Sequence, residues 1–285
     1  MSNLRLRLPL RRSLLSLMTA TSCAVACADD APVAARVDAS ALADQTTDLT
    51  TPFAPILPYR PSMSSPAQLP APGQLEFELG GLQSRAGGAR RSSLPYQFKL
   101  AFSPQWGLLI GGEAQVWQRD ADAGAPSVRG VGDTTLVLKR AWEVNVETGL
   151  GVEFGVKLAT ANELLGSGKT DYSVNTIYSR DLGGVQMDAN LNATRLGSVD
   201  ANSARTQFGA SVAFSLALTP RWGLATELVG TRRSGADSTQ QVLGALTFSP
   251  NPRLTYDFGV ARARWPAPAS TSVFAGVVFP IARLW

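Results

Sequence analysis

The sequence contains no histidine, and its two cysteines, Cys23 and Cys27, both lie near the N-terminus. Without histidine, the Ser-His-Asp and Cys-His arrangements of nucleophilic catalysis and imidazole metal sites are excluded. Charged residues make up 17% of the chain, a share too low for a disordered, solvated protein. We therefore expect an ordered protein that is not an enzyme, with no catalytic residue, no metal and no cofactor.

Long apolar runs are also missing after residue 28. The longest, Val273–Ala282, is interrupted by Gly276 and Pro280 and is well short of the ~18 residues that a membrane-spanning helix needs. Any crossing of a membrane by this part of the chain must therefore use strands.

The excess of positive charge is confined to the N-terminus. The formal net charge is +4, and the first 28 residues carry four arginines and no acidic residue. Without those four, 22 basic residues face 22 acidic ones, so the rest of the chain is neutral. The high isoelectric point thus reflects a targeting segment, and we predict no nucleic-acid partner.

Residues 1–28 have the layout of a secretory signal peptide. The basic segment is followed by a short apolar stretch, Ser13–Ala26, and by Ala26-Cys27-Ala28, a cleavage site of small residues. An N-terminal anchor helix is an alternative, but the stretch is shorter than the ~20 residues of a span. Lipoprotein processing before Cys23 or Cys27 is a second alternative. Cleavage after Ala28 removes both cysteines, so the mature chain has no disulfide.

Residues 29–73 form a separate Pro-rich segment that also contains many Ala, Ser and Thr residues. It shows no sustained period of either helix or strand, and such composition is typical of an extended, mobile linker. The alternative is a plug that folds into the lumen of a barrel. Its apolar contacts would be Phe53, Ile56, Leu57 and Tyr59.

From Gln74 onward the sequence alternates with a period of two. Leu75–Leu79 and Val185–Ala193 alternate apolar with polar residues, and Phe208–Leu218 alternates large apolar with small residues. This period places the two sets on opposite faces of a sheet. We predict twelve strands, at residues 74–84, 94–103, 106–118, 131–140, 144–160, 171–180, 184–195, 205–218, 222–232, 239–248, 254–262 and 272–285.

The connections between these strands alternate strictly between two lengths. Short turns are expected at 103–105, 141–143, 181–183, 219–221 and 249–253, and longer loops at 85–93, 119–130, 161–170, 196–204, 233–238 and 263–271. Short periplasmic turns and long external loops are typical of outer-membrane barrels. The fold class is therefore all-β: an antiparallel, up-and-down transmembrane β-barrel of about twelve strands over residues 74–285. Closure is required because lipid cannot satisfy the backbone hydrogen bonds of a sheet edge.

The tryptophans and the last strand fit this fold. Indole rings favour the two membrane interfaces, and the tryptophans fall at predicted strand ends: Trp106, Trp142, Trp222 and Trp285 at short turns, Trp117 and Trp265 at long loops. The C-terminal strand ends in Trp285 and is similar to the terminal signal that barrels present to their insertion machinery, which we therefore expect as a partner.

If the apolar face meets lipid, the polar face lines the lumen. Charged side chains facing lipid at the midplane would cost about 2–4 kcal/mol each for Lys or Arg. The candidate lumen-lining residues are Glu76, Glu78, Lys99, Glu113, Asp133, Lys139, Glu153, Lys157, Asp188, Asn190, Glu227 and Asp257. Both signs occur, so these residues either brace the wall through ion pairs or line a selective path.

Residues 74–285 resemble the outer-membrane transporter family of the phenol meta-pathway type. The matching segments are short and glycine-rich: residues 73–80 (GQLEFELG), 129–133 (RGVGD), 166–171 (GSGKTD) and 227–230 (ELVG). This resemblance implies a barrel for the uptake or export of small, often aromatic, molecules. It carries no established binding residues.

The leading hypothesis is a channel or transporter of the bacterial outer membrane for small hydrophobic or aromatic solutes. The alternative is a structural or surface-interaction barrel with no open path, and a barrel-embedded enzyme is a third reading that the missing histidine disfavours. The expected partners are outer-membrane lipid, the insertion machinery and a small solute.

Overall fold

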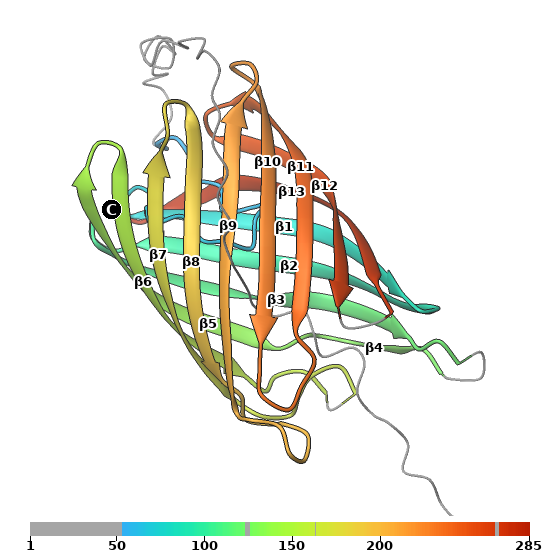
Figure 1. Ribbon diagram of the computed structural model, residues 1–285. Helices are drawn as coiled ribbons and strands as arrows, with labels where there is room; N and C mark the ends of the chain where they lie inside the picture. Colours follow the sequence, from blue (N-terminus) through green and yellow to red (C-terminus); the bar gives the residue numbers. More distant parts are fainter. Residues whose placement is uncertain (1–52, 123–125, 163, 266–267) are drawn as a thin grey trace, which may run out of the picture.

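The computed structural model describes residues 53–122, 126–162, 164–265 and 268–285 (Figure 1). The predicted signal peptide, residues 1–28, and residues 29–52 of the Pro-rich segment lie outside the described residues, as does the side chain of Trp265. Within the described ranges, no helix is long and apolar enough to span a membrane.

In the described residues, thirteen strands form one antiparallel sheet, and twelve of them close into a barrel (Figure 1). Each strand pairs with the next one in the sequence except β4, which does not pair with β5; β3 pairs with β5 instead, and β1 also pairs with β13. The strands are β1 (Gln74–Ala86), β2 (Ala89–Ala101), β3 (Trp106–Arg119), β4 (Val128–Gly130), β5 (Thr134–Asn145), β6 (Thr148–Leu158), β7 (Asp171–Asp181), β8 (Val185–Arg195), β9 (Thr206–Ala217), β10 (Trp222–Arg232), β11 (Thr239–Asn251), β12 (Leu254–Trp265) and β13 (Ser270–Arg283). The short β4 pairs only with β3 and is the one strand beyond the predicted twelve.

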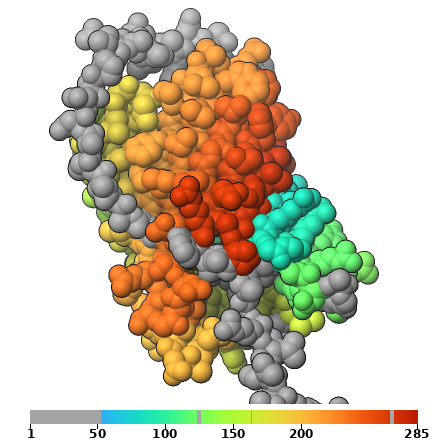
Figure 2. All heavy atoms as spheres, turned by 45° about the vertical axis from the view of Figure 1, so that its right-hand side comes forward, coloured from blue at the N-terminus to red at the C-terminus, as the bar shows by residue number. Residues whose placement is uncertain are grey.

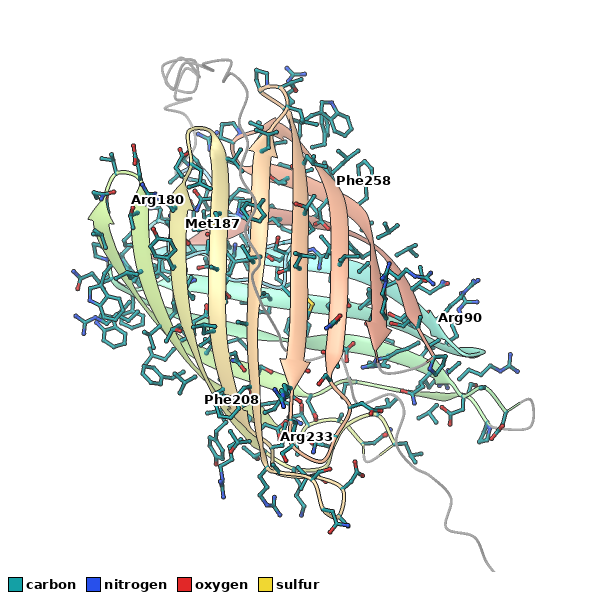
Figure 3. All side chains as sticks on the ribbon, viewed as in Figure 1. Arg90, Arg180, Met187, Phe208, Arg233 and Phe258 are labelled. Carbon is teal, nitrogen blue, oxygen red and sulfur yellow. The ribbon has the colours of Figure 1, made fainter. Side chains whose placement is uncertain are left out.

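The period of two separates a lipid face from a lumen face. On β9, Phe208 and Phe214 are exposed, whereas Ser211 and Ala213 between them are buried. Phe258 on β12 likewise points away from the barrel (Figure 3). On a soluble protein such a surface would be unfavourable, but in a membrane it meets acyl chains.

Aromatic pairs on the lipid face tie the first and last strands together. Phe77 on β1 packs against Phe98 on β2 with ring centroids 4.6 Å apart, and against Phe279 on β13 at 5.8 Å. Cross-strand aromatic pairs of this kind stabilise a sheet by roughly 0.5–1.5 kcal/mol beyond their buried area. They lie at the β1–β13 pairing that joins the two ends of the barrel.

Two predicted connections are wrong. The loop expected at residues 85–93 is instead a continuation of β1 and β2, which form a hairpin closed by Gly87 and Gly88, both with positive φ (52° and 90°). Glycine reaches this region without strain, so two residues suffice for the turn. The turn expected at residues 141–143 lies at Val146-Glu147, because β5 continues through Trp142 to Asn145.

The extension of β5 has a local cause. The Arg140 guanidinium lies over the ring of Trp106 at 5.0 Å and over the ring of Trp142 at 4.8 Å. These cation–π contacts on the outer face hold the strand in register past the position where the sequence suggested a turn.

Candidate functional site: the barrel interior

The structure places the candidate lumen residues on the inner face of the wall. Those that are buried are Glu76, Glu78, Lys99, Lys139, Glu153, Asp188, Asn190, Glu227 and Asp257. Three more are half-buried: Glu113, Asp133 and Lys157. Eight strands contribute to this set, from β1 to β12, and Asp133 lies just before β5.

Lysines on the wall neutralise several of these carboxylates. Lys99 Nζ lies 3.0 Å from Glu76 Oε2 and 2.6 Å from Glu78 Oε1, and Lys139 Nζ lies 3.3 Å from Glu153 Oε1. The spacing of Glu76 and Glu78, two residues apart on one strand, directs both to the same side. Burying such charges is favourable only when each finds a partner.

A third lysine fastens an external loop. Lys157 Nζ lies 2.9 Å from Asp133 Oδ2 and 3.1 Å from Asp171 Oδ2, and it donates to Ser167 Oγ at 2.6 Å. Ser167 belongs to the connection between β6 and β7. The glycine-rich segment at residues 166–171 is therefore held through Ser167 by a lysine whose charge two carboxylates balance.

Residues 53–73 run through the interior. Their partners come from strands on all sides of the barrel, including β1, β2, β5, β7, β8, β10 and β12. A segment that contacts so many strands must cross the space that they enclose. Most of these partners lie between the short-turn ends of the strands and their midpoints, so the segment occupies the half of the lumen next to the short turns.

The segment binds the wall mainly through its backbone. Leu57 N donates to both carboxylate oxygens of Glu76 at 3.2 Å, and Tyr59 N donates to Glu78 Oε1 at 2.8 Å. In the other direction, Lys99 donates to the carbonyl of Leu57. Glu76, Glu78 and Lys99, which pair with one another, thus also hydrogen-bond to backbone groups of Leu57 and Tyr59. This stretch of the chain is extended and belongs to no helix or strand.

Farther along, the chain bonds to the opposite wall. Met63 N and Ser64 N donate to Glu227 at 2.6–3.1 Å, and Ser64 Oγ lies 2.6 Å from the same carboxylate and 2.5 Å from Ser211 Oγ. Ser65 exchanges two bonds of 3.0 Å with Asn190, one through its N–H and one through its carbonyl. In the described residues no lysine pairs with Glu227. The N–H groups of Met63 and Ser64 and the Ser64 hydroxyl therefore stabilise its buried negative charge.

An ion pair lies between these two groups of contacts. Arg60 donates through Nε to Asp257 Oδ2 at 2.9 Å and through Nη2 to Asp257 Oδ1 at 3.0 Å. The guanidinium passes over Gly80 and Gly276, where an added Cβ would come within 2.7 Å and 2.3 Å of its atoms. Glycine at these two wall positions makes room for the bidentate pair.

Tyr59 lies at the centre of the packed segment. Its ring lies between Lys99 Nζ at 4.4 Å and Lys139 Nζ at 4.3 Å, and its hydroxyl donates to the carbonyl of Gln68 at 2.8 Å. Burial raises the pKa of Tyr59 well above its usual value, and the nearby carboxylates raise it further. The hydroxyl therefore stays protonated at neutral pH.

Sequence reasoning did not identify Arg60, Ser64, Ser179 or Ser211 as lumen residues. The plug alternative assigns apolar contacts to Phe53, Ile56, Leu57 and Tyr59; the structure adds hydrogen bonds from backbone N–H groups of the segment to the wall. Backbone donors leave no signal in the sequence. The isolated Tyr59-Arg60 pair within a Pro-rich stretch was the available clue.

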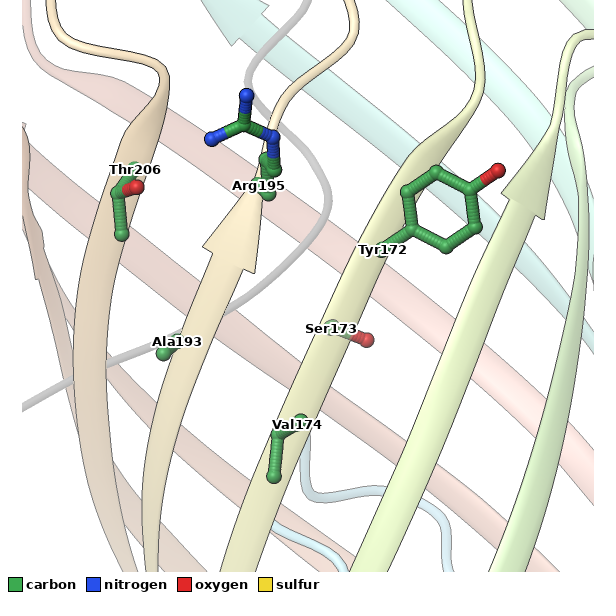
Figure 4. A pocket seen from close by; sticks show the side chains of 6 residues that line it. All are labelled: Tyr172, Ser173, Val174, Ala193, Arg195 and Thr206. Atoms are coloured by element: carbon green, nitrogen blue, oxygen red, sulfur yellow. The ribbon is translucent and has the colours of Figure 1, made fainter.

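The described tryptophan side chains lie on the outer face. Trp117, Trp142, Trp222 and Trp285 are exposed, and Trp106 is half-buried beside Arg140. A shallow hollow of about 240 Å³ lies on the same outer surface at the loop ends of β7, β8 and β9 (Figure 4), lined by Tyr172, Ser173, Val174, Ala193, Arg195 and Thr206. Its apolar floor and polar rim suit the boundary between acyl chains and headgroups.

The acidic residues of the interior are bound by other groups of the chain. In the part of the chain that the structure describes, no cluster of His, Cys, Asp or Glu residues could hold a metal ion. The carboxylates at the lumen wall are instead bound by lysines, an arginine and backbone N–H groups.

Solved structures show which proteins share this fold. The COG4313 outer membrane channel from Pseudomonas putida F1 superposes with a TM-score of 0.58 at 14% identity, covering 75% of this chain and 98% of the channel. The NanC porin superposes with a TM-score of 0.55 at 8% identity, covering 72% and 100%. No family model and no curated protein sequence matches the chain.

The fold is thus that of bacterial outer-membrane channels and porins. The closed twelve-strand wall, its apolar outer face and these structural neighbours place the protein in the bacterial outer membrane.

Proposed function

We propose that the protein is a channel for small hydrophobic or aromatic solutes, in which residues 53–73 act as a removable plug. The observation that carries this proposal is that a separate chain segment occupies the short-turn half of the lumen and is held there by hydrogen bonds to the wall. Side chains anchored on the strands fill the interior of eight-stranded barrels, but the diameter grows with the number of strands, so a wall of twelve strands leaves a wider interior that this segment enters. The solute class rests on the family resemblance.

The wall is prepared for the departure of the segment. Lys99 pairs with Glu76 and Glu78, and Lys139 with Glu153, through contacts within the wall that do not involve the segment, so these pairs can persist when it leaves. The bonds that are lost are exchanged for bonds to water, at a net cost of roughly 0.5–1.5 kcal/mol each. Glu227 and Asp257, whose partners lie in the segment, are the positions at which opening costs most.

The second candidate function is a structural or surface-interaction barrel with no open path. The packed short-turn half of the lumen favours it, since a permanently seated segment would block solutes. In both cases we propose outer-membrane lipid and the insertion machinery, through β13, as partners.

A reversible lock distinguishes the two candidates. Ser64→Cys and Ser211→Cys together place two thiols where the serine oxygens lie 2.5 Å apart, and signal cleavage after Ala28 leaves no other cysteine. For a plugged channel, the oxidised double variant in liposomes blocks the uptake of toluene or benzoate and the ion conductance, and a reductant restores both. The single variants serve as controls.

Other results speak against the proposal. A barrel that is impermeable before and after reduction supports the structural alternative. Equal uptake in the locked and reduced states shows that the solute path does not pass residues 53–73.

A further inference from the structure

A row of arginines crosses neighbouring strands on the outer face, at the loop end of the barrel. Strand pairing places Arg262 on β12 opposite Thr271 on β13, Thr271 opposite Arg85, Arg85 opposite Arg90, and Arg90 opposite Arg119 on β3. In the next row of outward-facing residues toward the membrane centre, Trp117 on β3 is opposite Arg129 on β4. We call these five exposed residues the arginine patch: Arg85, Arg90, Arg119, Arg129 and Arg262.

In the described residues, no ion pair neutralises the arginine patch. None of the five arginines makes an ion pair with any residue in the described ranges; Arg90 donates to Gln83 Oε1 at 2.6 Å and Arg262 to Thr271 Oγ1 at 3.2 Å. Like charges directly opposite one another on a sheet are destabilising, and here Arg85, Arg90 and Arg119 are three in a row. An external anion would remove this repulsion.

The surroundings indicate where this anion lies. The adjacent row toward the membrane centre runs Val260, Val273, Gln83, Ser92 and Trp117, with Val260, Val273 and Trp117 exposed. Leu79 and Leu94 are exposed on β1 and β2 nearer the membrane centre. The patch therefore borders the apolar band, and Trp117 marks the interface as indoles do in barrels.

The surface is also hollowed at this place. A depression of about 250 Å³ is lined by Arg90, Ser92, Trp117, Gln118, Arg119 and Ser127. Figure 2 shows the ends of β12 and β13 (red), the β1–β2 hairpin (cyan) and the region around β3 and β4 (green) side by side on this face. Arg90 extends away from the wall (Figure 3).

We propose that the arginine patch binds the phosphate groups of a phosphorylated lipid in the outer leaflet, with the acyl chains of that lipid against the apolar band below. Guanidinium groups match phosphate oxygens bidentately. A soluble anion would satisfy the charges but would gain nothing from the adjoining apolar row. This inference does not depend on whether the barrel conducts solutes.

The test compares lipid binding by full-length variants in detergent. Native mass spectrometry measures retention of a diphosphorylated lipid A and of the same lipid after enzymatic dephosphorylation. Wild type is expected to retain the phosphorylated form at least about tenfold more tightly. Arg90→Ala with Arg119→Ala is expected to weaken its binding by about tenfold or more, since each basic residue near an anionic surface contributes about a fivefold factor.

Matched controls distinguish lipid binding at the arginine patch from nonspecific attraction by other positive charges of the protein. Arg180→Ala with Arg221→Ala removes two exposed arginines from the short-turn end and is expected to change binding by less than about twofold. Arg90→Lys with Arg119→Lys keeps the charge but loses bidentate geometry, and we expect an intermediate effect. Heat-dependent gel mobility verifies that each variant is folded.

Three results would overturn the proposal. These are equal retention of the phosphorylated and dephosphorylated lipid by wild type, equal weakening by the control pair, and displacement of the lipid by millimolar inorganic phosphate. The last would show a site for a free anion.

Discussion

At the scale of single residues, Lys99 is the most connected side chain of the lumen. It is fully buried, pairs with Glu76 and Glu78, donates to the Leu57 carbonyl and lies over the ring of Tyr59. Two adjacent buried carboxylates repel each other unless a cation stands between them. Lys99 therefore links the stability of the wall to the seating of residues 53–73.

Replacing this lysine tests that role. Lys99→Met keeps most of the volume but leaves two buried carboxylates uncompensated, so the free energy of unfolding should fall by about 3–5 kcal/mol. Urea titration in lipid, followed by tryptophan fluorescence, measures this change. Lys169→Met removes an exposed lysine and is expected to cost less than about 0.5 kcal/mol. Equal losses in the two variants would contradict the assigned role of Lys99.

At the scale of elements, each strand has a lipid face and a lumen face. On β9, the outward positions carry Phe208, Val212, Phe214 and Leu216, and the inward positions carry small or polar residues such as Ser211 and Ala213. The pairing of β9 with β8 and β10 shows no register shift. The constant register therefore fixes, for each residue of β9, whether its side chain faces lipid or the lumen.

This assignment predicts a depth dependence. Val212→Arg places a charge on the lipid face near the middle of β9 and should destabilise the barrel by about 2–4 kcal/mol, whereas Leu218→Arg, at the short turn, should cost about 0–1 kcal/mol. Urea titration of both variants in lipid measures the difference. A Val212→Arg variant as stable as Leu218→Arg would mean that this face does not meet lipid.

The strands were predictable because their pattern is repeated along the whole barrel wall. Alternation located twelve strands to within a few residues, since a slip by one position would turn every apolar side chain toward the lumen. The β1–β2 hairpin was missed because Arg90 to Ser93 are polar on both faces, so the pattern that marks a strand is absent there. The short β4 lies within an expected loop and is too short for any period.

At the scale of the whole molecule, the barrel encloses a segment that comes before it in the chain. Residues 53–73 lead directly into β1, and Gly73 N bonds to the Ala101 carbonyl while the Gly73 carbonyl accepts from Leu284 N. The start of the barrel is thus joined both to the end of β2 and to the C-terminus. This arrangement directs the preceding residues inward.

The inward course of this segment was open from the sequence. Its composition favoured a mobile linker over a plug. The N–H groups of Met63, Ser64 and Ser65 that bind Glu227 and Asn190 are backbone donors, which every residue type except proline supplies. The inward direction of Glu76 and Glu78 followed from their strand, but their common partner Lys99 depends on the register between β1 and β2. The sequence pattern predicts on which face of the sheet a side chain lies. Contacts across the lumen can be identified only from the closed barrel.

The central claim is that one face of the strands lies in lipid and the other encloses a polar lumen that is filled in its short-turn half. Single-cysteine spin labels at residues 207–216 of β9, in bilayers, test it most directly through collision rates with oxygen and with a water-soluble nickel complex. We predict high oxygen accessibility at the even positions from Phe208 to Leu216, and low accessibility to both reagents at the odd positions of the filled half, from Ser211 to Ser215. A profile without this period, or with its phase reversed, would contradict the account.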